Sequence, residues 1–203
     1  MRSFYTPVLR LAPEAWGVLL LLALIASVAY QRDLLPLVLV CLLLGLVVAV
    51  FCHDMPRHSA ARPLGVLAPV DGVVSFRREC HDPYLGREAI RIGITVSPWG
   101  NYLLRVPVEG RVQAVSGGSR RVSHLRTDEG EDILVVVAKG TLLGAWPVWA
   151  PIGQRMGQGK LCGVRRFAKI IELYLPADSR VEVALGQTIR CGETVLATLL
   201  RRS

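Results

Sequence analysis

Two long apolar runs stand at the start of the chain. Residues 15–30 and 34–52 consist almost entirely of apolar side chains, and the polar turn Gln31-Arg32-Asp33 separates them. Neither run shows the periodic polar face of an amphipathic helix. As helices they would be about 24 and 28 Å long, close to the thickness of the hydrocarbon core of a bilayer. We therefore expect an N-terminal two-helix membrane hairpin over residues 1–54.

Basic residues flank the outer ends of this hairpin. Arg2 and Arg10 precede it, and Arg57 and Arg62 follow it. By the positive-inside rule, both termini and the rest of the chain would face the cytoplasm at the inner (cell) membrane. Because the runs are short, a hairpin that dips into one leaflet without crossing is the alternative. Residues 55–66 are polar and basic with two prolines, which predicts a linker.

From residue 67 onward, short β-type runs alternate with glycine and proline. Residues 89–96 and 133–138 are typical strands, whereas the polar, glycine-bearing residues 116–131 predict an exposed, mobile loop. Two phrases recur, Pro-Val-acid-Gly at 69–72 and 107–110, and a glycine-rich turn at 153–160 and 186–193. Their glycines predict turns that need positive φ or close backbone approach. We expect a mainly β, barrel-sandwich-like domain with pseudo-repeated hairpins over residues 67–203.

Charge and composition narrow the class of partner. The chain has 203 residues, a formal net charge of +8 and 52% apolar residues, of which few are aromatic. A basic chain suits either nucleic acid or an anionic membrane surface. No zinc-finger, RNA-binding or basic-helix pattern accompanies the charge, so we expect a membrane partner and no nucleic acid. Five cysteines without CxxC spacing indicate buried packing residues in a reducing compartment. His53 and His58 lie on a basic juxtamembrane segment, so we expect no metal site.

The stretch from residue 163 to 176 carries the strongest chemical signal. Arg165, Arg166 and Phe167 lead into Ala168-Lys169, and an apolar strand follows that ends at Pro176. Any reaction that the chain performs is expected at Ala168-Lys169, or is expected to have been lost there.

Several motifs together resemble the short bacterial and archaeal form of the phosphatidylserine decarboxylase family. The resemblance covers nearly the whole chain, and its most specific block, Gly163 to Pro176, aligns without a gap. The matching segments are Phe51–Arg57, Pro69–Gly72, Arg105–Gly110, Gly163–Pro176 and Gly186–Glu193. The resemblance implies a carboxy-lyase of phospholipid metabolism, which forms phosphatidylethanolamine with a pyruvoyl group made from its own Gly-Ser pair. It also implies that Asp71 is the retained family acid and that Arg105 is retained.

The chain departs from the family pattern at chemically linked positions. Ala168 stands at the position of the family glycine, Lys169 at that of the pyruvoyl-forming serine, and Tyr102 at that of the family histidine. Lysine has no oxygen on its β-carbon, so the elimination that yields the pyruvoyl group cannot occur. Lys169 cannot replace it as a Schiff-base partner either, because the substrate also brings an amine. We therefore expect no cofactor.

The leading hypothesis is a membrane-anchored, non-processing homologue that binds anionic phospholipid or regulates a catalytic paralogue. Arg105, Arg166 and Lys169 are its candidate lipid-binding residues. Lys169 could instead pair with Asp71 or be a solvated loop lysine, and Asp71 could be ordinary turn chemistry. An active phosphatidylserine decarboxylase is one alternative. The other is a biotin- or lipoyl-type carrier modified at Lys169, since Phe167-Ala168-Lys169-Ile170 is similar to the Ala-Met-Lys-Met of biotin acceptors.

Overall fold

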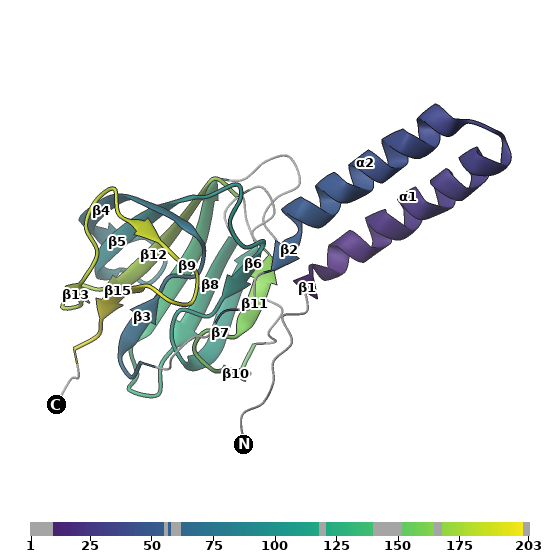
Figure 1. Cartoon of the computed structure of the whole chain (residues 1–203). Helices are drawn as coiled ribbons and strands as arrows, with labels where there is room; N and C mark the ends of the chain where they lie inside the picture. Colours follow the sequence, from purple (N-terminus) through teal and green to yellow (C-terminus); the bar gives the residue numbers. More distant parts are fainter. Residues whose placement is uncertain are drawn as a thin grey trace, which may run out of the picture. The chain divides into compact units, whose positions relative to one another are not determined.

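A computed structural model describes residues 10–54, 57, 62–117, 121–139, 152–164 and 168–200 of the chain (Figure 1). The chain divides into two compact units, Met1–Pro56 and Arg57–Ser203. We call the first the hairpin unit and the second the β unit.

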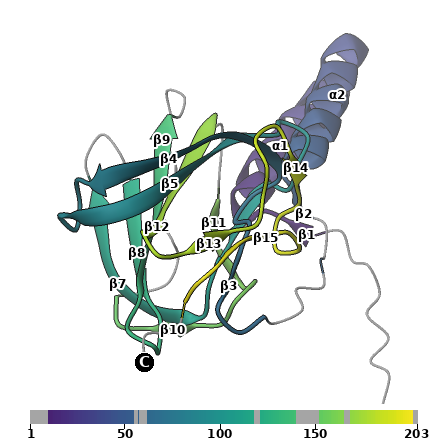
Figure 2. The same cartoon turned by 90° about the vertical axis from the view of Figure 1, so that its left-hand side faces the viewer.

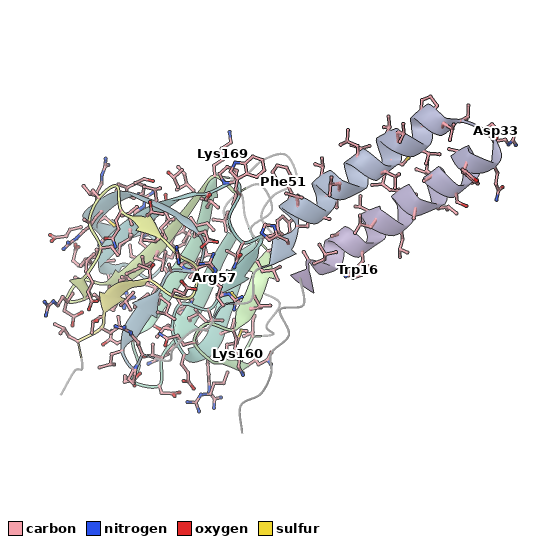
Figure 3. The ribbon with its side chains drawn as sticks, viewed as in Figure 1. Trp16, Asp33, Phe51, Arg57, Lys160 and Lys169 are labelled. Carbon is pink, nitrogen blue, oxygen red and sulfur yellow. The ribbon has the colours of Figure 1, made fainter. Side chains whose placement is uncertain are left out.

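The hairpin unit consists of two helices joined by a tight turn. Its elements in chain order are β1 (Arg10–Leu11), α1 (Pro13–Gln31), α2 (Leu35–Phe51) and β2 (His53–Asp54). The antiparallel pairing of β1 with β2 closes the base of the hairpin, and Asp33, with φ of 55°, lies at its tip (Figure 3). A proline is the first residue of α1 and the second of α2, where its missing N–H costs nothing. The predicted two-helix hairpin is confirmed.

One stripe of each helix is shielded from solvent by the other helix. The stripe on α1 consists of Ala15, Leu19, Leu22, Ala26 and Ala29, and that on α2 of Val38, Cys41, Gly45 and Val48. These positions are spaced alternately by four and three residues, as in a coiled-coil seam. Most other apolar side chains of both helices are exposed; Leu20 and Leu42, for example, are 68% and 62% exposed.

Among the described residues, no helix combines the length and the apolar character that crossing a membrane requires. The helix α2 has 17 residues, and α1 has 19 but includes Pro13-Glu14 at its start. A span needs about 20 consecutive apolar residues. The predicted membrane-spanning role of the hairpin is therefore not supported.

The β unit is built from antiparallel strands (Figure 2). In chain order they are β3 (Gly65–Leu67), β4 (Gly72–Asp82), β5 (Arg87–Val96), β6 (Leu103–Arg105), β7 (Gly110–Gly117), β8 (Arg121–Arg126), β9 (Asp132–Lys139), β10 (Arg155–Met156), β11 (Leu161–Val164), β12 (Ile170–Pro176), β13 (Arg180–Val181), β14 (Thr188–Ile189) and β15 (Val195–Thr198). The large sheet has the order β10-β7-β8-β9-β12-β5-β4-β14, and two smaller sheets pair β11 with β6 and β13 with β15 and β3. The prediction of a mainly β domain is confirmed.

The core of the β unit is aliphatic and draws on alternate positions of the large sheet. Ile92 and Ile94 of β5, and Ile171 and Leu173 of β12, are fully buried in it, together with Leu196 of β15 in a small sheet. The period-2 pattern of these strands brings every second side chain to the same face. The opposite face carries a second, smaller cluster of buried residues, formed by Ala89, Val122, Leu134, Val136 and Tyr174.

The expectation of a mobile loop over residues 116–131 is wrong in its central part. Residues 121–126 form β8, which pairs with both β7 and β9. Only Val122 and Leu125 of this strand are buried among its described side chains, so its sequence looks polar. The pairing of its backbone with two neighbouring strands outweighs that weak side-chain pattern.

The glycines of the two recurring phrases have the backbone geometry that the sequence predicts, either close approach to another strand or positive φ. At Gly72 a Cβ would come within 2.2 Å of the carbonyl oxygen of Thr95, and at Gly110 within 2.4 Å of that of Arg126. These two positions require close backbone approach. Gly153 and Gly186 instead adopt positive φ, at 86° and 78°.

Candidate functional site

Asp71 lies immediately before β4, at the end of the large sheet where β5 ends and β12 begins. Its side chain is 11% exposed. The motif explains the placement, because Gly72 lets the backbone approach Thr95 closely while the Asp71 carbonyl accepts the N–H of Ser97 at 2.9 Å. The carboxylate is thereby held at the start of the strand, facing the segments that surround it.

Three segments from distant parts of the sequence meet at this carboxylate. Its Oδ2 accepts the backbone N–H of Asn101 at 2.7 Å, and its Oδ1 accepts that of Cys191 at 2.8 Å. The guanidinium of Arg57 donates to Oδ2 at 3.3 Å. Both oxygens thus act as hydrogen-bond acceptors, which is the use of an ionised carboxylate.

Arg57 extends this network by contacting Glu193 as well as Asp71. Its Nη1 lies 3.6 Å from Oε2 of Glu193, and the arginine side chain is 15% exposed. The ion pair between Asp71 and Lys169 that the sequence suggested is therefore replaced by a pair with Arg57. Arg57 reaches the carboxylate of Asp71, but Lys169 lies on the far side of β5. Val96 of β5 pairs with Gly72, the neighbour of Asp71, on one side and contacts Lys169 on the other, so the backbones of Gly72 and Lys169 are two strand spacings, about 10 Å, apart.

Ala168 and Lys169 lie immediately before β12. Ala168 is buried in the aliphatic core, and the Lys169 carbonyl accepts the N–H of Val96 at 3.0 Å. The Lys169 side chain is exposed, and Figure 3 shows it at the edge of the β unit. Within the described part of the chain, its ammonium has no ion-pair partner. The structure therefore places an exposed cation at the position that the sequence resemblance aligns with the reactive serine of the family.

Tyr102 lies in the segment that joins β5 to β6, and Arg105 is the last residue of β6. Tyr102 is buried and follows Asn101, which donates to Asp71. Arg105 is buried as well. Its backbone N–H donates to Pro69 at 3.1 Å, and its Nη1 donates to the Gly159 carbonyl at 3.1 Å. Residues 69–71 therefore contact the backbone of Asn101, next to Tyr102, and the backbone of Arg105. The Arg105 side chain is buried.

Two buried thiols lie close to these charges. Burial raises the pKa of Cys162 to about 12, although the nearby Arg105 opposes the shift. Burial and the charge of Asp71 also raise the pKa of Cys191, whose Sγ donates to the Pro69 carbonyl at 3.1 Å. Both thiols are therefore protonated at neutral pH, and neither is an activated nucleophile.

Two further candidate residues, Arg166 and His58, lie outside the residues that the structure describes. Across the described ranges, no group of three or more His, Cys, Asp or Glu side chains could hold a metal ion.

Arg57, Asn101 and Cys191 are the partners of Asp71 that the sequence did not reveal. Asn101 and Cys191 contribute backbone N–H groups, which leave no trace in residue type. Arg57 ends the motif Phe51–Arg57 and so could have been singled out, but nothing in the sequence pairs it with an acid 14 residues later.

The comparisons with known proteins agree with the resemblance. No protein-family model matches the chain. Curated relatives named phosphatidylserine decarboxylase proenzyme do match it. One from Aromatoleum aromaticum is 29% identical over 77% of the chain and 80% of the relative, and one from Cupriavidus pinatubonensis is 27% identical with the same coverage. A third, from Burkholderia mallei, is 26% identical over 93% of the chain and 95% of the relative. This similarity, spread over most of the chain, relates it to the phosphatidylserine decarboxylase family.

Proposed function

We propose that this chain is a non-processing relative of the phosphatidylserine decarboxylases that associates with membranes and binds anionic phospholipid. In this proposal it forms no pyruvoyl group and acts within phospholipid metabolism as a binding or regulatory protein. A catalytic paralogue is its candidate partner.

The observation that carries this proposal is the residue at position 169. Pyruvoyl formation needs a β-oxygen that first attacks the preceding carbonyl and then leaves with the backbone carbonyl carbon attached. Lys169 has a methylene at that position. In addition, Ala168 is buried in the core, and the Lys169 carbonyl is engaged by Val96. No rearrangement of this backbone can yield a ketone at position 169.

The environment of Asp71 favours a structural role for this acid over a role in a reaction. Each oxygen of its carboxylate already accepts a backbone N–H, and Arg57 balances its charge. A carboxylate held this way fixes the segments that carry Asn101 and Cys191.

Binding of an anionic headgroup is proposed at Lys169. A lysine ammonium binds phosphate as a point charge, and this one is exposed and forms no ion pair with a described residue. Arg166 is proposed as a second cation on the basis of the sequence alone. Arg105 is buried, so we assign it to the support of the site through its contact with Gly159.

Membrane association is proposed for the hairpin unit without crossing of the bilayer. Large apolar side chains such as Trp16, Leu24 and Leu46 are exposed along both helices, at 58%, 63% and 62%. So much exposed apolar surface favours insertion into the headgroup and acyl boundary of one leaflet. The basic residues Arg10 and Arg57, on either side of the helices, favour the cytoplasmic leaflet.

Intact-mass analysis of the purified chain tests the central claim. We expect one species with the mass of the uncleaved, unmodified sequence. A fragment that begins with a carbonyl-blocked residue 169 would contradict the proposal and establish the active enzyme. A biotin or lipoyl adduct on Lys169 would contradict it in favour of the carrier.

The double variant Ala168→Gly/Lys169→Ser asks whether the serine alone restores processing. We expect this variant to stay a single chain on denaturing electrophoresis, because Tyr102 still occupies the position of the family histidine. Lys169→Ser alone is the matched control. Two bands that sum to the full length would mean that the rest of the processing machinery is intact.

A further inference from the structure

The strand β4 is much longer than the strand that pairs with it on its outer side. It spans Gly72–Asp82 and pairs with β5 on one side over this whole range, apart from one bulge. On the other side β14 pairs only with the first two residues of β4, and two backbone bonds between Val74 and residues 186–187 end the contact. Figure 2 shows the β4–β5 hairpin extending beyond β14. Among the described residues, no strand covers residues 75–82 on that side, which we call the open edge of β4.

Every second residue of this stretch turns its backbone toward the open edge. In an antiparallel ladder, the N–H and C=O of a residue lie on the same side of its strand, and successive residues alternate between the two sides. Val96 of β5 donates its N–H to Lys169, so the odd-numbered residues of β5 point toward β4. Arg91 is one of them and faces Arg78, whose backbone groups therefore point toward β5. The residues whose N–H and C=O point toward the open edge are Arg77, Glu79 and His81.

The open edge lacks most of the features that keep sheet edges from pairing. Natural edge strands are protected by proline, by lysine, by bulges or by being very short. Residues 75–82 contain no proline and no lysine, and the one bulge, at Ser75, lies at their beginning. An edge of this length is a template for a further strand, and the charges that it carries decide which strand fits.

These charges make the open edge complementary to itself. When two copies of one strand pair antiparallel, a two-fold axis relates them. With the axis at Arg78, Arg77 of each copy faces Glu79 of the other copy, and all three side chains are exposed in the chain itself. With the axis at Arg77 or at Glu79, two like charges would face each other, which destabilises the pairing. An axis at Cys80 would pair Glu79 with His81, which is largely neutral at pH 7.

The two Arg78 side chains meet at the favoured axis without facing each other directly. Each guanidinium lies over the ring of its own Phe76, 5.8 Å from the centre of the ring, and so extends along its own strand. The neighbouring Arg91 is neutralised by its ion pair with Glu172. The like charges at the axis are therefore fewer than the sequence suggests.

We propose that a second copy of this chain pairs with the open edge of β4, with the two-fold axis at Arg78. The two large sheets then join through β4 into one continuous sheet. Four backbone hydrogen bonds form, two for each pair of Arg77 with Glu79. Because the contact is two-fold, it closes as a dimer. Its area is small beside the roughly 1,600 Å² of a typical stable interface, so the dimer dissociates on dilution. It requires neither a bound lipid nor a membrane.

A cysteine at the axis tests the register. In Arg78→Cys, the new thiols of two copies lie opposite each other at a non-hydrogen-bonded pair, where Cα atoms are about 4.5 Å apart and a disulfide fits. The full-length chain in detergent micelles is oxidised with copper phenanthroline and analysed by non-reducing electrophoresis. Arg77→Cys and Glu79→Cys are the matched controls on the same exposed stretch, and the natural chain reports on its own Cys80. We expect a disulfide-linked dimer from Arg78→Cys alone.

Charge reversal tests the same pairing without a cross-link. In Arg77→Glu, two acids would face each other at two places in the dimer, so we expect its dissociation constant to rise about tenfold. The double variant Arg77→Glu/Glu79→Arg restores both pairs with their signs exchanged. We expect its dissociation constant to return to within about twofold of that of the natural chain. Sedimentation equilibrium of the full-length chains in density-matched detergent measures all three values.

Four results would overturn the proposed dimer. Cross-linking at Arg77→Cys, at Glu79→Cys or through Cys80 of the natural chain would place the axis elsewhere, and equal cross-linking at every position would indicate random collision. A chain that sediments as a monomer at every concentration would leave the open edge to a strand of a different protein. A dimer that Arg77→Glu does not weaken would assign self-association to another surface, such as the exposed leucines of the hairpin unit. A double variant no better than Arg77→Glu would mean that the two charges do not face each other.

Discussion

At the scale of single residues, Asp71 is the most tightly specified side chain of the site. An amide is nearly identical to a carboxylate in shape but offers one acceptor and one donor. In Asp71→Asn, the NH2 group would face the N–H of either Asn101 or Cys191, and Arg57 would lose its closest counter-charge. We expect a loss of about 3 kcal/mol in the free energy of unfolding, measured by urea denaturation.

Asp128→Asn is the control for this variant. Asp128 pairs with Arg155, and both side chains are about half exposed, at 53% and 55%. An exposed pair of this kind contributes less than about 1 kcal/mol. Equal effects of the two variants would mean that the Asp71 network contributes no more than a surface ion pair.

The raised pKa of Cys162 predicts a loss of stability in alkali. The ordinary pKa of the thiol is 9.0, and burial raises it to about 12 in the folded chain. Above pH 9 the unfolded chain releases this proton and the folded chain retains it, so the free energy of unfolding falls as the pH rises. Between pH 8 and 10, Cys162 should account for a fall of about 1 kcal/mol.

The variant Cys162→Ala isolates this contribution. Its absolute stability changes through packing, but the pH dependence is the quantity to compare. Urea denaturation at pH 8 and pH 10 should show a smaller fall for the variant than for the natural chain. Parallel pH profiles would show that Cys162 titrates alike in the folded and unfolded states.

The sequence could identify Asp71 and Lys169 but not their partners. The Pro-x-Asp-Gly motif indicates an acid held by a turn. A lysine at position 169 has no β-oxygen, so the sequence alone excludes pyruvoyl formation from that residue. The pairing of Asp71 with Cys191 joins residues 120 positions apart through a backbone N–H. Such a contact depends on how the strands are ordered, and no local pattern encodes it.

At the scale of elements, what the sequence predicted depended on how strongly side chains alternate. The strands β5 and β12 place isoleucine and leucine at every second position, and the apolar pattern indicates them directly. The strand β8 has few apolar residues, so its sequence predicts a loop although its backbone pairs with β7 and β9. In the hairpin unit, the seam marked by Ala15, Ala26 and Ala29 is invisible to hydropathy because its small residues and the exposed leucines are both apolar.

The start of β4 supplies a prediction at this scale. A Cβ at Gly72 would lie 2.2 Å from the Thr95 carbonyl oxygen, which is backbone and cannot rotate away. Gly72→Ala must push β4 from β5 and displace Asp71, so we expect it to lower the free energy of unfolding by about 3 kcal/mol. Gly86, in the β4–β5 turn, has φ of 63° and open space around it. Gly86→Ala should therefore cost only about 1 kcal/mol.

Thermal unfolding of the two glycine variants, followed by circular dichroism, provides the comparison. If Gly86→Ala is the more harmful of the two, the strain of positive φ outweighs the clash at Gly72. In that case the close approach of β4 and β5 at Asp71 is looser than the structure has it.

At the scale of the whole molecule, the two units have separate cores. The main aliphatic core draws its residues from Val66 to Leu199, all within the β unit, while the helices of the hairpin unit pack on each other through their own seam. Sequence reasoning could foresee two units, because the composition changes from unbroken apolar runs to short strands after a basic linker. It could not foresee the order of the strands in the large sheet, because that order depends on contacts between residues far apart in the sequence.

Separate cores predict that a chain of residues 57–203 folds on its own. We expect it to keep the circular dichroism and the cooperative unfolding of a β protein, because it retains all the sheets that enclose the core. Without the exposed leucines of α1 and α2, it should no longer sediment with phosphatidylcholine vesicles. Its remaining binding to phosphatidylglycerol vesicles would be electrostatic, so it should weaken as salt shortens the Debye length toward about 8 Å at physiological ionic strength. Tight binding to neutral vesicles would instead assign the main membrane contact to the β unit.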